Sequence, residues 1–302
     1  MAKPLAFRPN GFLLLAVAFW GLNFVAVKEV FAEIDPPAAA LLRFLVMWAG
    51  LVLVCLWKGE SLRLPREDAL RFLYLGFMSM GIYMVAFFEG MRGSGATEGA
   101  ILFQLSPVFT AILAASFGLE RFSKGSFAGA MVAFAGAAMI VYSPSPADHN
   151  RALSNLIVIG AALLWAYSVT LMRSLLVRYS PLRVLTLSMP GALPVMLVYG
   201  LMPAARQPWH AVSPYAWLKF AQVSLMSGIV AFLCFYRGIR DVGASGATLY
   251  QFLTPVGATI FAMAIERSIP TTFQVLGLTV VLAGVGFASR ARLVAEVQPA
   301  EA

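Results

Sequence analysis

Charged residues are scarce in this sequence: Lys, Arg, Asp and Glu make up 12% of its 302 residues. A soluble domain of this size needs about twice that share of charge to cover its surface. Hydrophobic residues make up 60%, the mean hydropathy is +0.82, and long apolar runs recur along the whole chain. The scarcity of charge therefore excludes an ordinary soluble domain and indicates an integral membrane protein.

Cysteine and histidine are scarce as well. Cys55 and Cys234 both lie in strongly apolar stretches, which excludes a disulfide framework and a zinc site and leaves small buried hydrophobic residues. His149 and His210 lie in polar connecting segments without a second ligand type at metal spacing. We therefore expect no metal and no cofactor. The net charge of +8 comes without a basic cluster interleaved with aromatic residues, so we expect no nucleic-acid partner.

Apolar runs of roughly 17–25 residues, the length of helix that crosses a bilayer, are what the chain has in abundance. They are continuous, whereas the strands of a membrane barrel alternate apolar and polar residues, so we expect helices. The predicted spans are 12–31, 36–57, 70–91, 96–117, 125–142, 153–176, 182–201, 215–236, 243–264 and 272–290.

The distribution of Lys and Arg predicts the orientation, because positively charged joints stay in the cytoplasm. With the N-terminus inside, the inside segments hold fifteen of the 22 Lys and Arg residues and the outside segments hold six. The remaining one, Arg43, falls within the second span. We therefore expect both termini to be cytoplasmic in a multi-pass protein of the plasma membrane.

The second half of the chain repeats the first. FFEGMRGSGATEGAILFQLSPVF, which starts at Phe87, aligns with FYRGIRDVGASGATLYQFLTPVG, which starts at Phe235, at a constant offset of 148 residues. Trp20 in AFWGLNFVAVK matches Trp165 in LLWAYSVTLMR at an offset of 145. The repeat covers five spans, and because five is odd the second copy enters the membrane from the opposite face.

We therefore predict an all-α integral membrane protein with ten transmembrane helices arranged as two inverted five-helix repeats. The first repeat covers residues 1–142, a linker covers 143–152, the second repeat covers 153–290 and a cytoplasmic tail covers 291–302. Inverted repeats are common in secondary transporters, where two related halves exchange inward-open and outward-open shapes. The alternative is a duplication that merely enlarged a membrane scaffold.

Four sequence motifs also carry a family resemblance: W-G-x-N at Trp20, the two G-x-x-x-x-G-A-[TS] segments, a proline eleven residues after each Gly-Ala, and a following Glu-Arg. They resemble the drug/metabolite transporter superfamily over nearly the whole chain. The two halves resemble paired EamA domains, and the chain is similar to YddG-type exporters of aromatic and other amino acids. This resemblance implies a transporter of the bacterial inner membrane but specifies its substrate poorly.

Polar and aromatic residues at matching depths in the two halves predict a cavity suited to a neutral or zwitterionic organic molecule. Interhelical hydrogen bonding is the alternative for the amides, and ordinary helix packing is the alternative for each aromatic residue. The candidate substrate-binding residues are Trp20, Asn23, Tyr83, Phe87, Phe103, Gln104, Trp165, Ser168, Phe235, Tyr250 and Gln251.

Matching glycines and prolines are candidate hinges. We expect Gly95 and Gly243 at the short joints before the fourth and ninth spans, where a helical hairpin could pivot. Pro107 and Pro255 lie eleven residues after each Gly-Ala and should kink those two spans. Close packing is the alternative role for the glycines, and an inert, locally accommodated proline is the alternative for each kink.

The acidic residues bear on ion coupling. Glu89 and Glu98 lie near predicted helix ends, and no carboxylate falls clearly in the middle of a span. We therefore expect transport without proton coupling or, alternatively, coupling through one of these two residues, which could instead pair with Arg92. Arg43 cannot lie in hydrocarbon unpaired. A structural role is the first expectation for it, and contact with a substrate carboxylate is the second.

The predicted function is export of amino acids, aromatic and other neutral ones, or of similar small metabolites by alternating access. A membrane enzyme is not expected, because the spans hold no Ser/His dyad, no paired aspartates and no H-E-x-x-H helix. The alternatives are efflux of cationic or aromatic drugs and, further off, a passive channel or a lipid scramblase. The expected partners are the small-molecule substrate and the lipid bilayer, around a monomer.

Overall fold

The computed structural model describes residues 10–117, 124–141, 149–251, 253–265, 267 and 269–297. Within these ranges every regular element is a helix, as the sequence predicts. The helices are α1 Gly11–Phe31, α2 Pro36–Trp57, α3 Ala69–Gly76, η1 Phe77–Ile82, α4 Tyr83–Gly93, α5 Ala96–Leu102, η2 Phe103–Leu105, α6 Ser106–Ser116, α7 Lys124–Val141, α8 His149–Leu176, α9 Pro181–Arg206, η3 Trp209–Ala211, α10 Pro214–Ala221, η4 Gln222–Val230, α11 Ala231–Gln251, α12 Thr254–Ile265 and α13 Thr272–Val297.

Six helical stretches in the described part of the chain are long and apolar enough to cross a bilayer. They are Gly11–Phe31, Pro36–Trp57, Ala69–Gly93, Arg151–Leu176, Pro181–Arg206 and Pro214–Asp241. The chain is therefore a multi-pass, all-helical membrane protein. The other predicted spans fall on α5 to α7 and on α11 to α13, which are shorter apolar helices or helices with an interruption.

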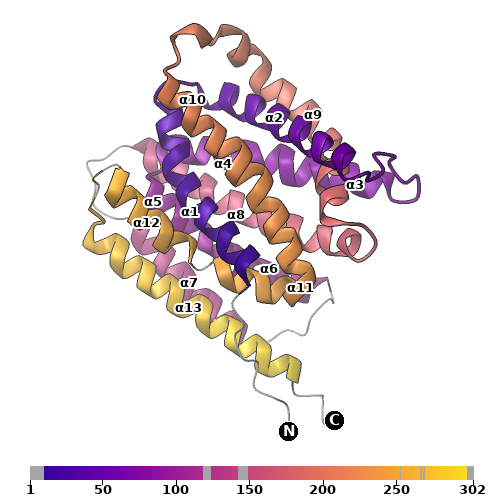
Figure 1. The fold of residues 1–302 in the computed structure, drawn as a ribbon. Helices are drawn as coiled ribbons and strands as arrows, with labels where there is room; N and C mark the ends of the chain where they lie inside the picture. Colours follow the sequence, from indigo (N-terminus) through magenta and orange to yellow (C-terminus); the bar gives the residue numbers. More distant parts are fainter. Residues whose placement is uncertain are drawn as a thin grey trace.

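The helices pack in pairs that are distant in sequence (Figure 1). The pairs with the most extensive contact are α7 with α13, α2 with α9, α4 with α8, and α1 with α11 and α12. Glycines allow the closest approach: a Cβ added at Gly284 of α13 would lie 2.4 Å from the backbone nitrogen of Ala133 in α7. Helices in lipid have no hydrophobic driving force for association, so close van der Waals packing at small residues holds them together instead.

Two long helices share the same irregularity at repeat-related positions. The stretch from α3 to α4 contains the π-helical segment η1, and the stretch from α10 to α11 contains the π-helical segment η4. Residues 77–82 of η1 correspond to 225–230 within η4 at the 148-residue offset. A π-segment releases backbone groups from the helical ladder and is frequent at functional sites. Here the carbonyl of Ser227 accepts a hydrogen bond from the Trp20 indole at 3.2 Å.

The prolines interrupt their spans differently from the prediction. Pro107 is the second residue of α6, after the 3₁₀ turn η2, and Pro255 is the second residue of α12, after a turn at Leu253. Each proline does interrupt its predicted span eleven residues after the Gly-Ala, but as a break between two helices rather than a bend within one. A proline lacks the N–H that would continue a helix and disfavours helical backbone at the residue before it. The chain accordingly ends one helix and starts another at each site.

The joint predicted before Gly243 is also different, because α11 continues through it to Gln251. The contacts of α1 nevertheless show that the chain reverses nearby: Gly238 lies against Leu13, whereas Ala258 lies against Gly21. A straight helix rises about 1.5 Å per residue, which would carry Ala258 away from Gly21. The direction of the chain thus changes between Gly238 and Ala258, a segment in which Gly243 and Gly246 weaken the helix.

Polar contacts gather at two ends of the bundle. At one end, the buried carboxylate of Asp68 accepts hydrogen bonds from Arg71 at 2.9 Å, Arg178 at 3.1 Å and Tyr179 at 3.0 Å. Burial alone would raise the pKa of Asp68, but the hydrogen bonds from Tyr179 and Arg178 lower it below its usual range. Asp68 therefore stays ionised at neutral pH and joins the start of α3 to the joint between α8 and α9.

At the other end, Glu98 is 2% exposed and joins three helices. Its carboxylate accepts hydrogen bonds from Arg151 of α8 at 2.6 and 2.9 Å and from Gln274 of α13 at 3.3 Å. The alternative pairing of Glu98 with Arg92 is therefore wrong, because Arg151 lies closer to the buried carboxylate. Glu89 does lie 3.9 Å from Arg92, as expected for it, and accepts a hydrogen bond from Tyr199 at 2.5 Å.

Two glycines form the tightest helix crossing of the described chain. A Cβ added at Gly76 in α3 would lie 1.7 Å from the carbonyl oxygen of Ser188 in α9, and a Cβ added at Gly191 in α9 would lie 1.9 Å from the carbonyl oxygen of Leu73. Both obstacles are backbone atoms, so no side-chain rotation relieves them. The absence of a side chain at these two positions sets the distance between α3 and α9.

We predict that Gly76→Ala lowers the melting temperature of the detergent-purified protein, because overpacking of a close contact costs about 1–3 kcal/mol or more. The matched control is Gly160→Ala in α8, where no atom lies within 4 Å of the added methyl group. That control should leave the melting temperature unchanged or raise it. Equal melting temperatures for the two variants would contradict the crossing described.

Candidate functional site

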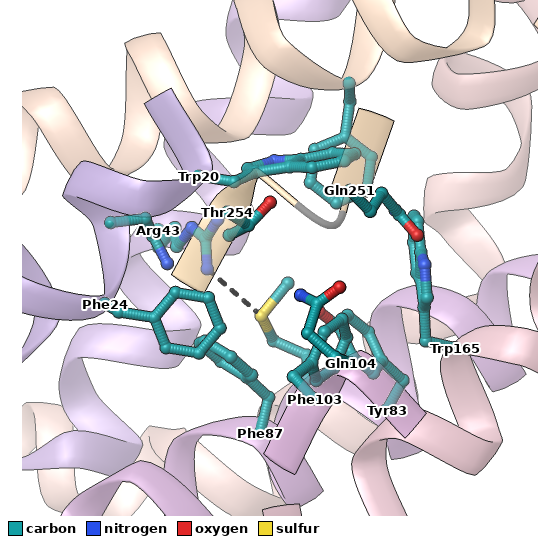
Figure 2. Close-up of a pocket in the computed structure, with 13 residues that line it drawn as sticks. Trp20, Phe24, Arg43, Tyr83, Phe87, Phe103, Gln104, Trp165, Gln251 and Thr254 are labelled. Carbon is teal, nitrogen blue, oxygen red and sulfur yellow. Dashed lines mark hydrogen bonds between the residues drawn. The ribbon is translucent and has the colours of Figure 1, made fainter. Parts of the chain in front are cut away.

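A pocket lies where α1, α2, α4, α8, α11 and α12 meet the 3₁₀ turn η2 (Figure 2). The pocket is partly open, and the unfilled space in and around it, open solvent included, is about 510 Å³. The residues that line it are Trp20, Asn23, Phe24, Arg43, Tyr83, Met84, Phe87, Phe103, Gln104, Trp165, Phe232, Gln251 and Thr254.

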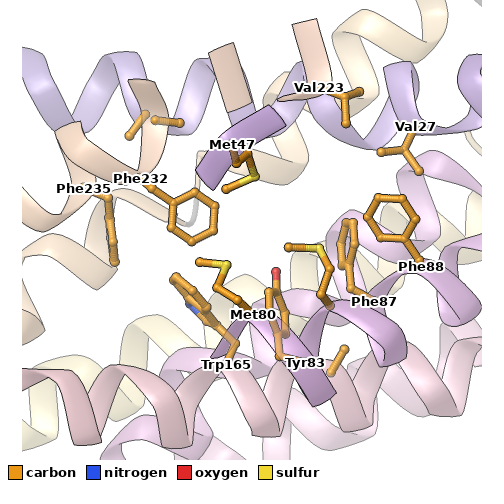
Figure 3. Packing of buried hydrophobic residues seen from close by; sticks show 14 of the residues in the cluster. Val27, Met47, Met80, Tyr83, Phe87, Phe88, Trp165, Val223, Phe232 and Phe235 are labelled. Carbon is orange, nitrogen blue, oxygen red and sulfur yellow. The ribbon is translucent and has the colours of Figure 1, made fainter. Parts of the chain in front are cut away.

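Aromatic rings form most of the wall. The ring centroids of Trp20 and Trp165 are 5.9 Å apart in an edge-to-face arrangement, and Tyr83 lies 5.4 Å from Trp165. Phe24 and Phe87 continue the same wall, 5.6 Å apart. Figure 3 shows the buried apolar layer around them, to which Tyr83 and Phe87 belong. Such packing holds the rings in fixed orientations around the pocket.

Unpaired polar atoms distinguish this wall from an ordinary core. Six lining residues each hold a buried polar atom without a hydrogen-bond partner among the described residues. These atoms are Asn23 Oδ1, Arg43 Nε, Gln104 Oε1, Trp165 Nε1, Gln251 Oε1 and Thr254 Oγ1. Buried polar groups are paired almost everywhere else in proteins, so a cluster of unpaired ones marks a place where a ligand or water completes the bonding.

The broken helices bring part of this polar set into the pocket. Gln104 belongs to the 3₁₀ turn η2, and Gln251 and Thr254 flank the turn between α11 and α12. A helix break at each repeat-related proline therefore places an amide in the wall. Gln251 corresponds to Phe103, and Phe232 corresponds to Met84, at the 148-residue offset. Equivalent positions of both halves face the same pocket.

Eight of the eleven predicted binding residues line this pocket; Ser168, Phe235 and Tyr250 do not. The Ser168 hydroxyl donates a hydrogen bond to the Leu164 carbonyl of its own helix at 2.8 Å. Phe235 packs against Trp20 with the ring centroids 4.9 Å apart. The Tyr250 hydroxyl accepts a hydrogen bond from the Asn10 backbone N–H at 2.9 Å. The side chain of each of these three residues thus already has a partner within the protein.

Five lining residues were absent from the predicted set: Phe24, Met84, Phe232, Thr254 and Arg43, for which substrate contact was only the second expectation. Phe24 lies one helical turn after Trp20, so the face of the helix that carries Trp20 could have indicated it. The repeat alignment pairs Met84 with Phe232 but does not give the depth at which either lies. Thr254 precedes the second proline, and only the break at that proline turns its hydroxyl into the pocket.

Two of the four predicted hinge residues, Pro107 and Pro255, lie at helix breaks beside the pocket. Gly95 is the N-cap of α5, and its backbone N–H lies 3.4 Å from a carboxylate oxygen of Glu98. Pro107 and Pro255 start the helices that follow the two turns, and Gly243 lies within α11. Among the described residues, no group of three or more His, Cys, Asp or Glu side chains could hold a metal ion.

The sequence profile of the EamA-like transporter family matches residues 9–142 and 152–290, which is most of the chain. The chain belongs to the EamA-like transporter family. The finding also makes this protein a membrane transporter of small molecules in the drug/metabolite transporter superfamily, as the sequence motifs predict. Its pocket is therefore the part of a transporter in which substrate recognition is to be sought.

Curated relatives of this EamA-like transporter are similar over nearly their whole length. The uncharacterized transporter YyaM of Bacillus subtilis is 25% identical over 276 residues, which cover 90% of each chain. A "Probable terminal-alkyne amino-acid exporter" of Streptantibioticus cattleyicolor is 25% identical, over 93% of each chain. A "Probable amino-acid metabolite efflux pump" of Salmonella typhimurium is 24% identical, over 92% of this chain and 93% of its own.

A solved crystal structure has the same fold. It superposes with a TM-score of 0.65 at 18% sequence identity, over 95% of this chain and 97% of the other. An identity this low speaks for the fold alone.

We predict that Gln104→Leu raises the melting temperature of the ligand-free protein, because it replaces a buried, unpaired amide oxygen, whose desolvation costs about 1–3 kcal/mol, by an apolar group of similar size. The control is Gln274→Leu, which removes the hydrogen bonds of the Gln274 amide to Glu98 and to the Thr271 backbone N–H. That variant should melt at a lower temperature. The Gln104 amide nitrogen donates a long hydrogen bond of 3.5 Å to the Ala100 carbonyl. A loss of stability in Gln104→Leu as large as in Gln274→Leu would contradict the expectation that the unpaired oxygen outweighs this bond.

Proposed function

We propose that this transporter exports amino acids, aromatic and other neutral ones, or similar small metabolites across the bacterial inner membrane by alternating access. The observation that carries the proposal is the pocket of aromatic walls and six unpaired polar atoms at the meeting of the two halves. Apolar surface with a few fixed polar groups suits an amphipathic organic molecule. The names of the Streptantibioticus and Salmonella relatives, which refer to amino-acid export and efflux, support the same substrate class.

Ten spans in two inverted halves form part of the proposal, and the contacts at the two ends of the bundle support it. Glu98 at the start of α5 bonds Arg151 at the start of α8 and Gln274 near the start of α13. Residues in contact at one end of the bundle lie on the same side of the membrane. The chain must therefore cross the membrane an even number of times between any two of these three residues. We infer that α5 with α6 forms one span, α7 another, the end of α11 with α12 a third, and α13 a fourth. The two ranges that match the family profile, 9–142 and 152–290, agree with this division.

The orientation of the chain in the membrane is inferred from which joints contact one another. Joints that the charge count assigns to the cytoplasm contact one another, as in the hydrogen bond from Arg178 to Asp68 and those from Arg183 to the carbonyls of Ser61 and Arg63. Joints assigned to the outside also contact one another, as in the hydrogen bonds from Ser213 to Glu33. Both termini are then cytoplasmic.

We assign the hinges of this motion to the two helix breaks. Pro107 and Pro255 each follow a turn that carries a pocket residue, Gln104 before the first and Gln251 before the second. Gly95 and Gly243 lie at the other ends of the same segments. Rotation about the breaks would move the pocket wall together with the helix that follows, which opens one side while it closes the other.

The pocket favours this function over efflux of cationic drugs. Its only charged lining residue among those described is Arg43, and no carboxylate lines it. A cationic drug without an acidic group would therefore meet a like charge in a space of low dielectric.

The proposed function predicts saturable counterflow. Proteoliposomes preloaded with unlabelled L-phenylalanine should accumulate external labelled L-phenylalanine faster than empty ones, because an alternating-access carrier returns in the loaded form. Trp165→Ala removes a large part of the pocket wall and should lower the rate by about tenfold or more, a loss of 1.4 kcal/mol in transition-state stabilisation. Trp57→Ala, which changes an exposed tryptophan at the end of α2, is the matched control. An uptake rate that is the same with and without preloaded amino acid would indicate a channel. Uptake of cationic dyes alone would favour drug efflux.

The proposed topology predicts which joints a membrane-impermeant thiol reagent reaches in intact cells of a strain lacking the outer membrane barrier. In a background where Cys55 and Cys234 are replaced by alanine, a cysteine at Gln207 should be labelled from outside. A cysteine at Arg66 should be labelled only after the membrane is permeabilised. The reverse pattern would show that the orientation is wrong, and labelling of both from outside would contradict the assigned number of crossings.

A further inference from the structure

Arg43 is the only charged residue among the described lining residues of the pocket, and it lies in the middle of α2. The residue is 3% exposed. Figure 2 shows its guanidinium entering the pocket between Trp20 and Phe24, with Thr254 beside it. A cation in this position is held away from both ends of the bundle, where arginines such as Arg178 and Arg183 have carboxylate or carbonyl partners.

The partners of Arg43 within the described chain are weak. One guanidinium nitrogen, Nη1, lies 3.4 Å from the thioether sulfur of Met84, and the guanidinium carbon lies 5.6 Å from the centroid of the Phe88 ring. Its Nε is buried without an acceptor, and no carboxylate of the described residues forms an ion pair with the guanidinium. Sulfur is a poor acceptor, so five N–H donors lack strong partners.

A buried charge in this state is costly unless an opposite charge joins it. Charged groups kept inside a membrane protein mark substrate or ion paths, and a guanidinium matches a carboxylate through two parallel hydrogen bonds. We propose that Arg43 is the specificity residue of this pocket and binds the carboxylate of the substrate, which makes a carboxylate a required part of every substrate.

The opposite end of such a substrate also has partners in the pocket. Asn23, Gln104 and Gln251 each present an amide whose oxygen is unpaired. An ammonium group has three N–H donors and no acceptor, so neutral amide oxygens can bind it without a second buried charge. Arg43 and these amides together suit a zwitterion, and the rings of Phe24, Phe87 and Phe103 remain for an apolar side chain.

This inference rests on the proposed function and narrows it. Amino-acid export in general requires only a polar and aromatic pocket. A carboxylate bound by Arg43 requires in addition that a molecule lacking only that group is rejected. The decarboxylated amine should be rejected for two reasons. It brings a positive charge near Arg43, and it leaves the guanidinium without a carboxylate partner.

The experiment compares four ligands with the purified full-length protein, by equilibrium binding and by thermal shift. L-phenylalanine has both charged groups, phenethylamine lacks the carboxylate, phenylpropionate lacks the ammonium group, and phenylalaninamide has a neutral group in place of the carboxylate. We expect L-phenylalanine to bind at least about tenfold more tightly than phenethylamine or phenylalaninamide, which equals 1.4 kcal/mol. Phenylpropionate should bind more weakly than the amino acid but more tightly than the amine.

Variants separate recognition from folding. Arg43→Gln should weaken L-phenylalanine binding at least about tenfold, remove the preference over phenylalaninamide, and raise the melting temperature of the ligand-free protein because an unpaired buried charge is gone. A purely structural arginine would instead give a lower melting temperature. Arg43→Lys keeps the charge and should retain part of the preference. Arg66→Gln removes one exposed positive charge from the joint between α2 and α3 and should change none of these values.

The outcomes distinguish the two proposals. If the wild-type protein binds L-phenylalanine and phenethylamine equally, and Arg43→Gln does the same, the role of Arg43 is wrong while amino-acid export stands. If no amino acid binds but phenylpropionate binds in an Arg43-dependent way, the carboxylate site stands and the proposed function fails. If Arg43→Gln does not fold, the ligand preferences of the wild-type protein and of Arg43→Lys decide.

Discussion

The cost of an unpaired polar group in an apolar interior is the constraint on which the rest of this structure depends. In a bilayer each such group costs several kcal/mol, so the backbone is satisfied within helices and charged side chains move to the ends of the bundle. Asp68 at one end and Glu98 at the other are buried, and each is paired with arginine. Of the ten buried polar side-chain atoms without a partner in the described chain, six gather in the pocket, and we propose that a transported ligand binds them.

Close packing and the pocket place opposite demands on the same helices. Gly76 and Gly191 allow α3 and α9 to touch through their backbones, which fixes these helices firmly. Directly after Gly76, the π-segment η1 begins, and it precedes Tyr83 and Met84, which line the pocket. Rigid crossings, irregular turns and broken helices thus alternate along one path, and such an arrangement lets a wall move without loss of the bundle.

Sequence alone predicts the helical membrane fold, the repeat and eight of the pocket residues, because apolar length and self-similarity depend on local composition. It does not predict that α11 continues past Gly243, since small residues are compatible with a joint and with a helix alike. It also cannot separate Tyr250, whose hydroxyl the Asn10 backbone occupies, from Gln251, whose amide oxygen is unpaired. Adjacent residues on one helix point in different directions, and only the three-dimensional contacts decide which one meets the pocket.

The central claim is that the unpaired polar atoms of the pocket bind the charged groups of an amino acid. A structure of the protein with bound L-bromophenylalanine tests it most directly, because the bromine fixes the orientation of the ligand by its anomalous signal. The account predicts the carboxylate at hydrogen-bond distance from Arg43, the ammonium group beside Gln104 or Gln251, and the bromine among Phe24, Phe87 and Phe103. An amino acid bound elsewhere, with ordered waters completing every polar atom of this pocket, would contradict it.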